Sequence, residues 1–253
     1  MARKQQDDRE ELAFLASYDA ARFPRPSVAV DVVLLTVREG AVWALLGQRS
    51  GHPHRGRWAL PGTFVGMDEP LDGAAARVLR AKVGLEEVFT EQLYTFGAPK
   101  RDPRTRVISV AYYALVEHPV LEHAIASHTE GDLVLARLVV PWPGEAGGPV
   151  SATDRDGMPL PLAFDHADIL GMAVRRIRGK LDYVPIGFEL LPSAFSLRDL
   201  RLVHEAILGR PLNKDSFRRR ILDRGLVVPT GEQAAGVGHR PPQLYRFADR
   251  SAT

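Results

Sequence analysis

The chain has 253 residues, of which 45% are hydrophobic and 25% charged, and it contains no cysteine. The length suits one large domain or two modest ones, the composition is that of a globular protein, and we favour two domains. Without cysteine there is no disulfide framework, no thiolate metal site and no cysteine nucleophile, which fits a cytoplasmic protein. No apolar stretch approaches the roughly 18 residues of a membrane span, and an acidic run near the N-terminus interrupts any signal-peptide core. We therefore expect neither membrane insertion nor export.

Positive charge is concentrated in the C-terminal third of the chain. The formal net charge is only +2, but residues 166–253 contain 15 Lys and Arg against 9 Asp and Glu. The rest of the chain is net acidic, with 18 against 22. This asymmetry suggests that the C-terminal part binds a polyanion, although solvated helix faces explain the same charges.

Hydrophobic patterning over the first two thirds predicts strands with one helix among them. Two apolar runs at 27–37 and 41–49 flank a tight turn, as in a hairpin of buried strands. A helix is predicted up to Gly84, with Pro70 in its first turn and the glycine as its stop signal. Further strands are predicted within 88–99, 106–117 and 131–142, the first two joined by a charged loop at 100–105, and a Gly/Pro-rich connector follows at 143–161.

The segment 165–182 is predicted to form an amphipathic helix that bridges two units. Its apolar face and its basic face are expected to lie opposite each other. The apolar positions are Ile169, Leu170, Ala173 and Ile177, and the basic ones are Arg175, Arg176, Arg178 and Lys180. Asp165 stands where the N-cap of this helix is expected.

The last 58 or so residues have the element order of a winged helix-turn-helix. A helix starts at Ser196, with Asp199 at the capping-box position, and ends at Gly209. A short turn leads to a basic helix over 213–225, in which Phe217 and Ile221 lie four residues apart and are expected to face the core. Two short β-like runs, at 226–229 and 243–247, then flank a Gly/Pro-rich loop.

The segment from Trp58 to Leu85 resembles the Nudix box. In the Nudix family the box runs from a glycine through a glutamate to an Arg-Glu helix with two further glutamates. Here Thr63 takes the first glycine, Glu69 the first glutamate and Arg77 the arginine, with Leu79 and Gly84-Leu85 completing the spacing. The three helix glutamates, which hold divalent metals in that family, are replaced by Val78, Ala81 and Lys82. We therefore expect no metal site and no catalysis, with residual hydrolysis through Glu69 as the alternative.

The resemblance extends over about residues 20–250. The segments around 23–37, 57–65, 96–115 and 163–170 look like the ADP-ribose-directed branch of the Nudix family. Together with residues 190–222, they resemble the Nudix-related transcriptional regulators of NAD metabolism, the NrtR family. This resemblance implies an α/β (α+β) Nudix sandwich followed by a winged helix-turn-helix domain. The expected limits are 20–163 for a ligand-sensing domain, 164–190 for a bridging helix and linker, and 191–253 for a DNA-binding domain.

Candidate ligand contacts lie in two loops and in the Nudix box. Arg55 and Arg57 are suited to bind a pyrophosphate, unless they are simply solvated, and Trp58 stacks on the nucleotide or anchors the loop. Arg77 is expected to pair with Glu69. The expected ligand-binding set is Arg55, Arg57, Trp58, Gly62, Glu69, Arg77, Arg101, Asp102 and Arg104, of which the last three make either ligand contacts or an ion-paired turn. The family resemblance adds that residues 164–166 sense the pocket.

A polar segment, 117–130, contains three histidines and three glutamates. Their spacing matches no metal-ligand pattern, so a polar surface turn is the preferred interpretation.

The basic helix is the candidate for reading DNA. Lys214, Ser216 and Arg219 are expected to face bases or phosphates, and Arg218 and Arg220 to flank phosphates. The expected DNA-binding set is Asn213, Lys214, Ser216, Arg218, Arg219, Arg220 and, in the wing, Arg240.

The function that the resemblance implies is a repressor of NAD biosynthesis or salvage genes that responds to ADP-ribose or a related nucleotide. A homodimer on a palindromic DNA operator is expected, because two-fold symmetric proteins read such sites. The sign of the ligand effect is left open. The alternatives are an active pyrophosphohydrolase acting on ADP-ribose and a scaffold or RNA-binding adaptor.

Overall fold

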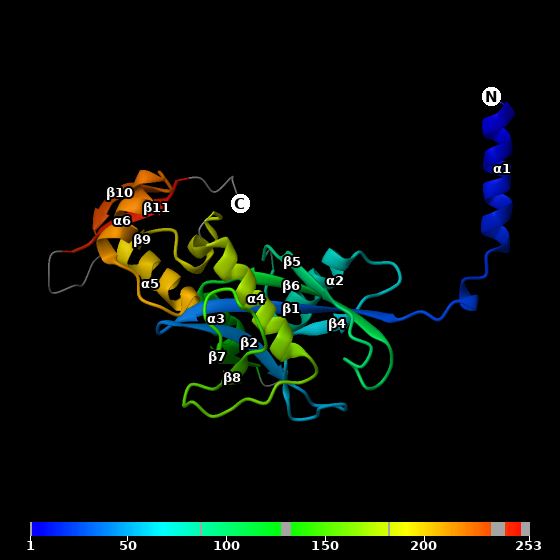
Figure 1. The fold of residues 1–253 in the computed structure, drawn as a ribbon, viewed down its shortest axis with the longest axis horizontal. Coiled ribbons are helices and arrows are strands. Elements are labelled where there is room, and N and C mark those ends of the chain that lie inside the picture. Colours follow the sequence, from blue (N-terminus) through cyan, green and yellow to red (C-terminus); the bar gives the residue numbers. More distant parts are fainter. Residues whose placement is uncertain (1, 87, 128–132, 182, 234–240, 249–253) are drawn as a thin grey trace.

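The computed structural model describes residues 2–86, 88–127, 133–181, 183–233 and 241–248 (Figure 1). A central sheet carries helices on both faces, and a smaller helical unit with a three-stranded sheet lies at one end. The helix α1 stands away from this body. In chain order the elements are α1 (Ala2–Ser17), η1 (Ala20–Arg22), β1 (Ser27–Arg38), β2 (Ala41–Gln48), β3 (Trp58–Ala59), β4 (Gly62–Phe64), α2 (Leu71–Val78), η2 (Leu79–Val83), β5 (Glu91–Phe96), β6 (Val107–Leu115), α3 (His118–Ser127), β7 (Leu133–Val139), β8 (Ser151–Thr153), α4 (His166–Lys180), η3 (Ile186–Leu190), β9 (Phe195–Ser196), α5 (Leu197–Leu208), α6 (Lys214–Asp223), β10 (Val227–Gln233) and β11 (Gln243–Phe247).

The large sheet has the strand order β5-β6-β1-β2-β7-β8, with β3 paired to β2 and β4 to β1. The pair β1 and β6 is parallel, and the other pairs are antiparallel. Successive residues of a strand face opposite sides of the sheet, so β1 divides its apolar side chains between two cores. Val33 and Leu35 join one core, and Val32 and Leu34 the other.

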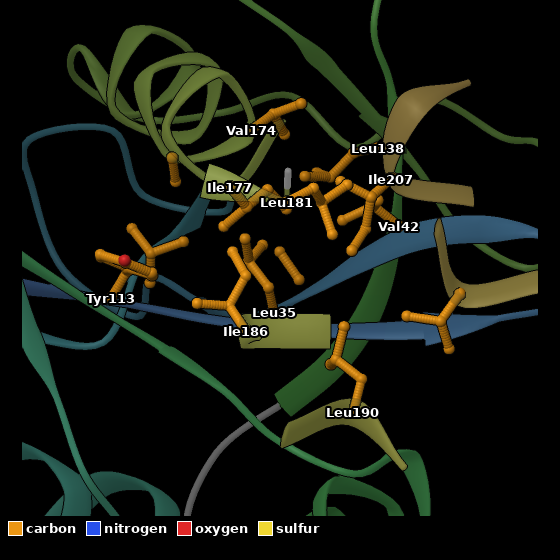
Figure 2. Close-up of a cluster of buried hydrophobic side chains, with 14 of the residues drawn as sticks. Leu35, Val42, Tyr113, Leu138, Val174, Ile177, Leu181, Ile186, Leu190 and Ile207 are labelled. Carbon is orange, nitrogen blue, oxygen red and sulfur yellow. The ribbon is translucent and has the colours of Figure 1, made fainter. Parts of the chain in front are cut away.

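Each core is closed by helices. The face of Val32 and Leu34 is covered by α2 and α3. The face of Leu35 is covered by α4 and continues without interruption into the C-terminal unit, where Ile207 of α5 packs in the same cluster (Figure 2). The two predicted units therefore share one hydrophobic core, which makes α4 and α5 parts of a single packed interface.

The C-terminal unit has the predicted winged helix-turn-helix order. Ser196 and Asp199 form the predicted capping box of α5, and Gly209 ends that helix in the left-handed conformation, with φ of 67°. Phe217 and Ile221 of α6 are buried, as predicted from their spacing. The strands β10, β11 and β9 form the small sheet of the wing.

Two predictions about helices were wrong. Arg178 does not lie on a solvated basic face but is only 7% exposed, because it completes the buried stripe four residues after Val174. The polar segment predicted as a surface turn contains α3, whose His118 pairs with Glu122 at 3.1 Å. Leu121 and Ala124 supply the apolar face that makes this a helix, since both pack into the core beneath α3.

The predictions of no membrane span and no metal site rested on composition and spacing. Within the described ranges, no helix has the length and apolar character needed to cross a membrane. Nor does this part of the chain contain three or more His, Asp or Glu side chains grouped so as to hold a metal ion.

Candidate functional site

A cavity of about 670 Å³ opens at the ends of the central strands β1 and β2 of the large sheet, a size typical of small-molecule sites. Its walls come from β1, the end of β2, the β3–β4 segment, the last turn of the α2–η2 helix, the loop after β5 and the residues before α4. Four cationic side chains line it, against two carboxylates. The cations are Arg49, Lys82, Arg101 and Arg104, and the carboxylates are Asp31 and Asp102.

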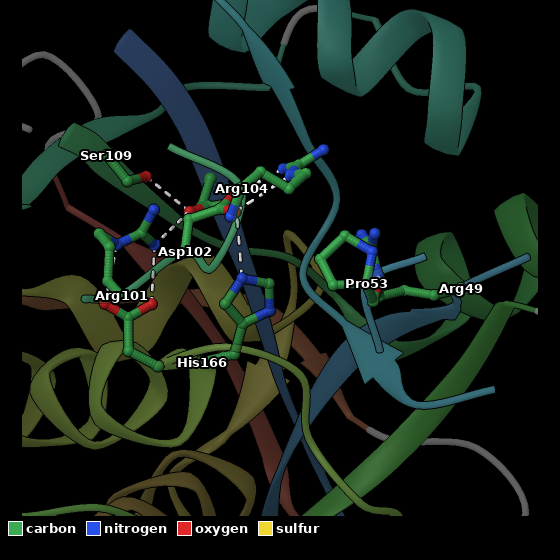
Figure 3. A network of polar contacts seen from close by, with 9 residues as sticks. Arg49, Pro53, Arg101, Asp102, Arg104, Ser109 and His166 are labelled. Atoms are coloured by element: carbon green, nitrogen blue, oxygen red, sulfur yellow. Dashed lines mark hydrogen bonds and ion pairs between the residues drawn. The ribbon is translucent and has the colours of Figure 1, made fainter. Parts of the chain in front are cut away.

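A buried ion-pair network forms the floor of this cavity (Figure 3). Asp31 of β1 accepts hydrogen bonds from Ser109 Oγ at 2.5 Å and from Arg101 Nη2 at 3.4 Å. Arg101 also donates to both carboxylate oxygens of Asp165, at 2.8 and 2.7 Å. Burial acts to lower the pKa of Arg101, but these carboxylates outweigh it and the pKa is raised, so the guanidinium stays charged. The network ties β1 and β6 to the start of α4.

His166, the first residue of α4, is buried beside this network. Its Nδ1 accepts a hydrogen bond from the backbone N–H of Leu60 at 2.9 Å, and its Nε2 lies 3.8 Å from an oxygen of Asp31. Burial lowers the pKa of His166, so the imidazole is neutral at physiological pH. The ring therefore fixes the β3–β4 segment directly on the N-terminus of α4.

Phe164 brings an aromatic face to the cavity between two arginines. The guanidinium of Arg49 lies 4.8 Å from the ring centroid, and that of Arg104 lies 5.9 Å away. Arg104 is held by two hydrogen bonds to Asp102, at 3.0 and 2.7 Å. Phe164 has φ of 50°, a conformation uncommon for a bulky residue, and such strain gathers at functional sites. Cations around an aromatic ring suit a ligand that combines anionic and planar groups.

The Nudix-box residues do not fit a divalent metal. Val78 is 1% exposed within the core, and Ala81 offers no ligand atom. Glu69 is bound by Arg77, at 2.5 and 3.1 Å, and by the N–H of Gly66 at 2.7 Å, and these bonds lower its pKa to about 2. The predicted pairing of Glu69 with Arg77 is thus present, and it leaves the carboxylate engaged rather than directed at the cavity.

The predicted ligand residues fall into two groups. The cavity is lined by Gly62, Arg101, Asp102 and Arg104, but not by Arg55, Arg57, Trp58, Glu69 or Arg77. Arg55 and Arg57 are exposed in the loop before β3, where Arg57 donates to the carbonyl of Leu162 at 3.4 Å. Trp58 packs against the core, which is the anchoring role. Only glycine fits at position 62 without a shift of its neighbours, because a Cβ there would lie 2.3 Å from Asp31 Oδ1.

Several cavity residues escaped the sequence prediction. Arg49 and Asp31 line the cavity but were not among the expected ligand residues. Phe164 and His166 also line it, and they belong to the segment 164–166 that the family resemblance implied would sense the pocket. Asp165 occupies the predicted N-cap position, but its side chain makes no capping bond because Arg101 engages both oxygens. A charged residue in the middle of an apolar strand, as at Asp31, was the available signal, since buried charges need partners.

The candidate DNA surface lies on α6. Lys214, Ser216 and Arg219 are exposed, as are Arg218 and Arg220, while the opposite side of the helix is buried. Asn213 caps the helix, its Oδ1 accepting from the N–H of Ser216 at 3.0 Å, so only its amide nitrogen is left to donate elsewhere. The guanidinium of Arg220 lies 5.7 Å from the ring of Phe217. Arg240 lies outside the described residues.

Comparison with known proteins gives matches to both parts of the chain. Residues 25–139 match the NUDIX domain, and residues 187–247 match the NrtR DNA-binding winged helix domain. The chain is 37% identical over 242 residues to the ADPR responsive transcriptional repressor NtrR of Acinetobacter baylyi, covering 94% of this chain and 88% of that protein.

Solved structures agree with this relationship. Shewanella oneidensis NrtR complexed with a 27mer DNA is 34% identical, with a TM-score of 0.69, over 87% of this chain and 93% of that one. A MutT/nudix family protein from Enterococcus faecalis is 25% identical, with a TM-score of 0.72, over 94% and 92% of the two chains. With its Nudix domain, its winged helix domain and this full-length relationship, the chain belongs to the NrtR family of Nudix-related transcriptional regulators.

Proposed function

We propose that this protein is a transcriptional repressor of NAD biosynthesis or salvage genes whose binding to DNA is set by ADP-ribose. The observation that carries the proposal is the cationic cavity built directly on the start of α4, the helix that packs against the winged helix domain. The relative from Acinetobacter baylyi is named for its response to ADPR, and the solved relative from Shewanella oneidensis is bound to DNA.

The cavity suits a dinucleotide-like diphosphate. Four cationic side chains line the cavity, and although Asp165, Asp102 and Asp31 pair with Arg101 and Arg104, Arg49 and Lys82 make no ion pair among the described residues and can face the two negative charges of a diphosphate diester. Arg49 keeps most of its donors available, because the contact to the carbonyl of Pro53, at 2.8 Å, uses only Nε. Phe164, flanked by Arg49 and Arg104, offers the aromatic surface on which a planar base or a ribose packs.

The route from the cavity to the DNA surface is short and packed. Phe164 and His166 line the cavity, and His166 is the first residue of α4. Near the other end of this helix, Lys180 pairs with Glu91 at 2.5 Å. Arg178 on the same helix donates to the carbonyl of Ile207 at 2.7 Å, at the end of α5. A ligand that binds one arrangement of this interface more tightly shifts the population of DNA-binding molecules, and DNA must shift ligand affinity reciprocally.

The DNA complex we propose is that of a homodimer on a palindromic operator. The recognition helix α6 enters the major groove, where Lys214, Ser216 and Arg219 face bases or phosphates while Arg218 and Arg220 contact phosphates. The proposed domain limits are 20–163, 164–190 and 191–253. The NUDIX match ends at residue 139 and the winged helix match begins at residue 187.

We also propose that the Nudix domain binds ADP-ribose without hydrolysing it. Catalysis in a Nudix box requires carboxylates that hold metal ions and stabilise the developing charge, and Val78, Ala81 and Lys82 do not supply them. Glu69 is the one glutamate of the box pattern that this sequence retains, and its carboxylate is paired with Arg77.

Calorimetric titration with ADP-ribose, together with a phosphate-release assay coupled to phosphatase, tests both statements. We expect binding without the formation of AMP and ribose phosphate. Metal-dependent turnover would favour the pyrophosphohydrolase, and the absence of any nucleotide binding would favour a scaffold.

A further inference from the structure

The cavity places a lysine where the Nudix fold would hold a metal. On the last helical turn of the Nudix box, Ala81 and Lys82 line the cavity. The side chain of Lys82 is accessible to solvent, and its ammonium donates a hydrogen bond to the carbonyl of Gly62 on the facing wall. Partial desolvation there lowers the pKa of Lys82, while Asp31 acts to raise it. One of three ammonium protons is used by the carbonyl, so the others remain for a ligand.

The carboxylates around the cavity are already committed to guanidinium groups. Asp31 bonds Arg101, and Asp102 bonds Arg104 through both oxygens. A divalent cation at Asp102 would have to displace Arg104, and one at Asp31 would lie close to Arg101 and to the Lys82 ammonium, at a cost in charge repulsion. The positive charge that a diphosphate needs must therefore come from side chains.

We infer that the Lys82 ammonium takes over the role of the metal, neutralising the diphosphate of the bound nucleotide together with Arg49, so that the effector site works without any divalent cation. The inference rests on the proposed function and deepens it. The hydrogen bond to Gly62 fixes the ammonium at the β4 wall of the cavity, and the guanidinium of Arg49 lies over Phe164, 4.8 Å from its ring centroid. The diphosphate is then bound by cations from two elements, Lys82 of η2 and Arg49 directly after β2. An effector bound in this way is neither hydrolysed nor sensitive to the magnesium concentration.

The first part of the test uses the wild-type protein. ADP-ribose is titrated calorimetrically in EDTA and again in excess Mg²⁺, and we expect the same affinity in both. Binding only with Mg²⁺ would overturn the inference and leave the proposed effector role standing. No binding in either condition would overturn the proposed effector role and this inference with it.

The second part assigns the charge to Lys82. In EDTA, Lys82→Gln is expected to weaken ADP-ribose binding by about 10- to 100-fold, the value of a charge-assisted hydrogen bond. The matched control is Arg80→Gln, because Arg80 is an exposed cation on the same turn that does not line the cavity. Lys82→Arg should retain most of the affinity, and unchanged circular dichroism and thermal midpoints establish folding. A Lys82→Gln variant that binds as tightly as Arg80→Gln would contradict the inference.

Discussion

Replacement of Arg178 by methionine would test the junction between the two domains. The guanidinium donates to three carbonyls, those of Ile207 at 2.7 Å, Gly144 at 2.8 Å and Trp142 at 3.2 Å. Methionine retains the apolar stem and removes all three hydrogen bonds. The positive charge near the C-terminus of α5 is lost as well, where a cation is favourable.

The expected destabilisation follows from which carbonyls water can reach. Gly144 is exposed, so its carbonyl can bond water instead and the loss of this hydrogen bond lowers stability little. Ile207 is fully buried, so its carbonyl is left without a partner. A buried acceptor left without a partner costs about 1–3 kcal/mol, and the bond to Trp142 contributes about 0.5–1.5 kcal/mol. We therefore expect Arg178→Met to lower the free energy of unfolding by about 3 kcal/mol.

Urea denaturation followed by circular dichroism measures this value. Arg175→Met is the control, because Arg175 lies on the exposed side of the same helix and its replacement should change stability by less than about 0.5 kcal/mol. If both variants lose the same small amount, Arg178 does not join α4 to α5 energetically, and the proposed route from the cavity to the DNA surface loses its main polar contact.

Three further predictions concern the Nudix loop and the winged helix. Because the pKa of Glu69 is lowered from 4.5 to about 2, its stabilising contribution is complete above about pH 4.5 and is lost as the pH falls towards 2. The difference in unfolding free energy between wild type and Glu69→Gln should therefore shrink over that range, and a difference independent of pH would be inconsistent with the ion pair. Phe217→Ala should cost about 3–5 kcal/mol, because the ring is 3% exposed in the core, and a thermal midpoint close to that of the wild type would argue against this packing. Arg218→Ala should weaken DNA binding and reduce the slope of log affinity against log salt by about 0.9, whereas an unchanged slope would place Arg218 away from phosphate.

Local signals predicted the elements of the fold well. The stop at Gly84 has φ of 73°, and the capping box at Ser196 and Asp199 forms as written in the sequence. The burial of Phe217 and Ile221 follows from their helical spacing alone. In each case the cause lies within a few residues along the chain.

The cavity was harder to predict, because its residues meet only after folding. Arg101 and Asp165 are 64 positions apart, yet they form the central ion pair of the floor. The sequence shows that Lys82 replaces a metal-binding glutamate. Its hydrogen bond to the carbonyl of Gly62 could not be predicted, because it depends on β4 lying next to the helix in the fold. The charge of Arg178 predicts a solvent-exposed side chain. Its position four residues after the buried Val174 places it on the buried side of α4 instead.

The central claim is that ADP-ribose binding and DNA binding are coupled in one molecule. The most direct measurement is fluorescence anisotropy of the labelled intergenic DNA upstream of the protein's own gene, at fixed salt, with and without ADP-ribose. We predict tight binding relative to scrambled DNA and a clear change in affinity when the nucleotide is present. Equal, weak binding to both DNAs, or sequence-selective binding that ADP-ribose leaves unchanged, would contradict the account.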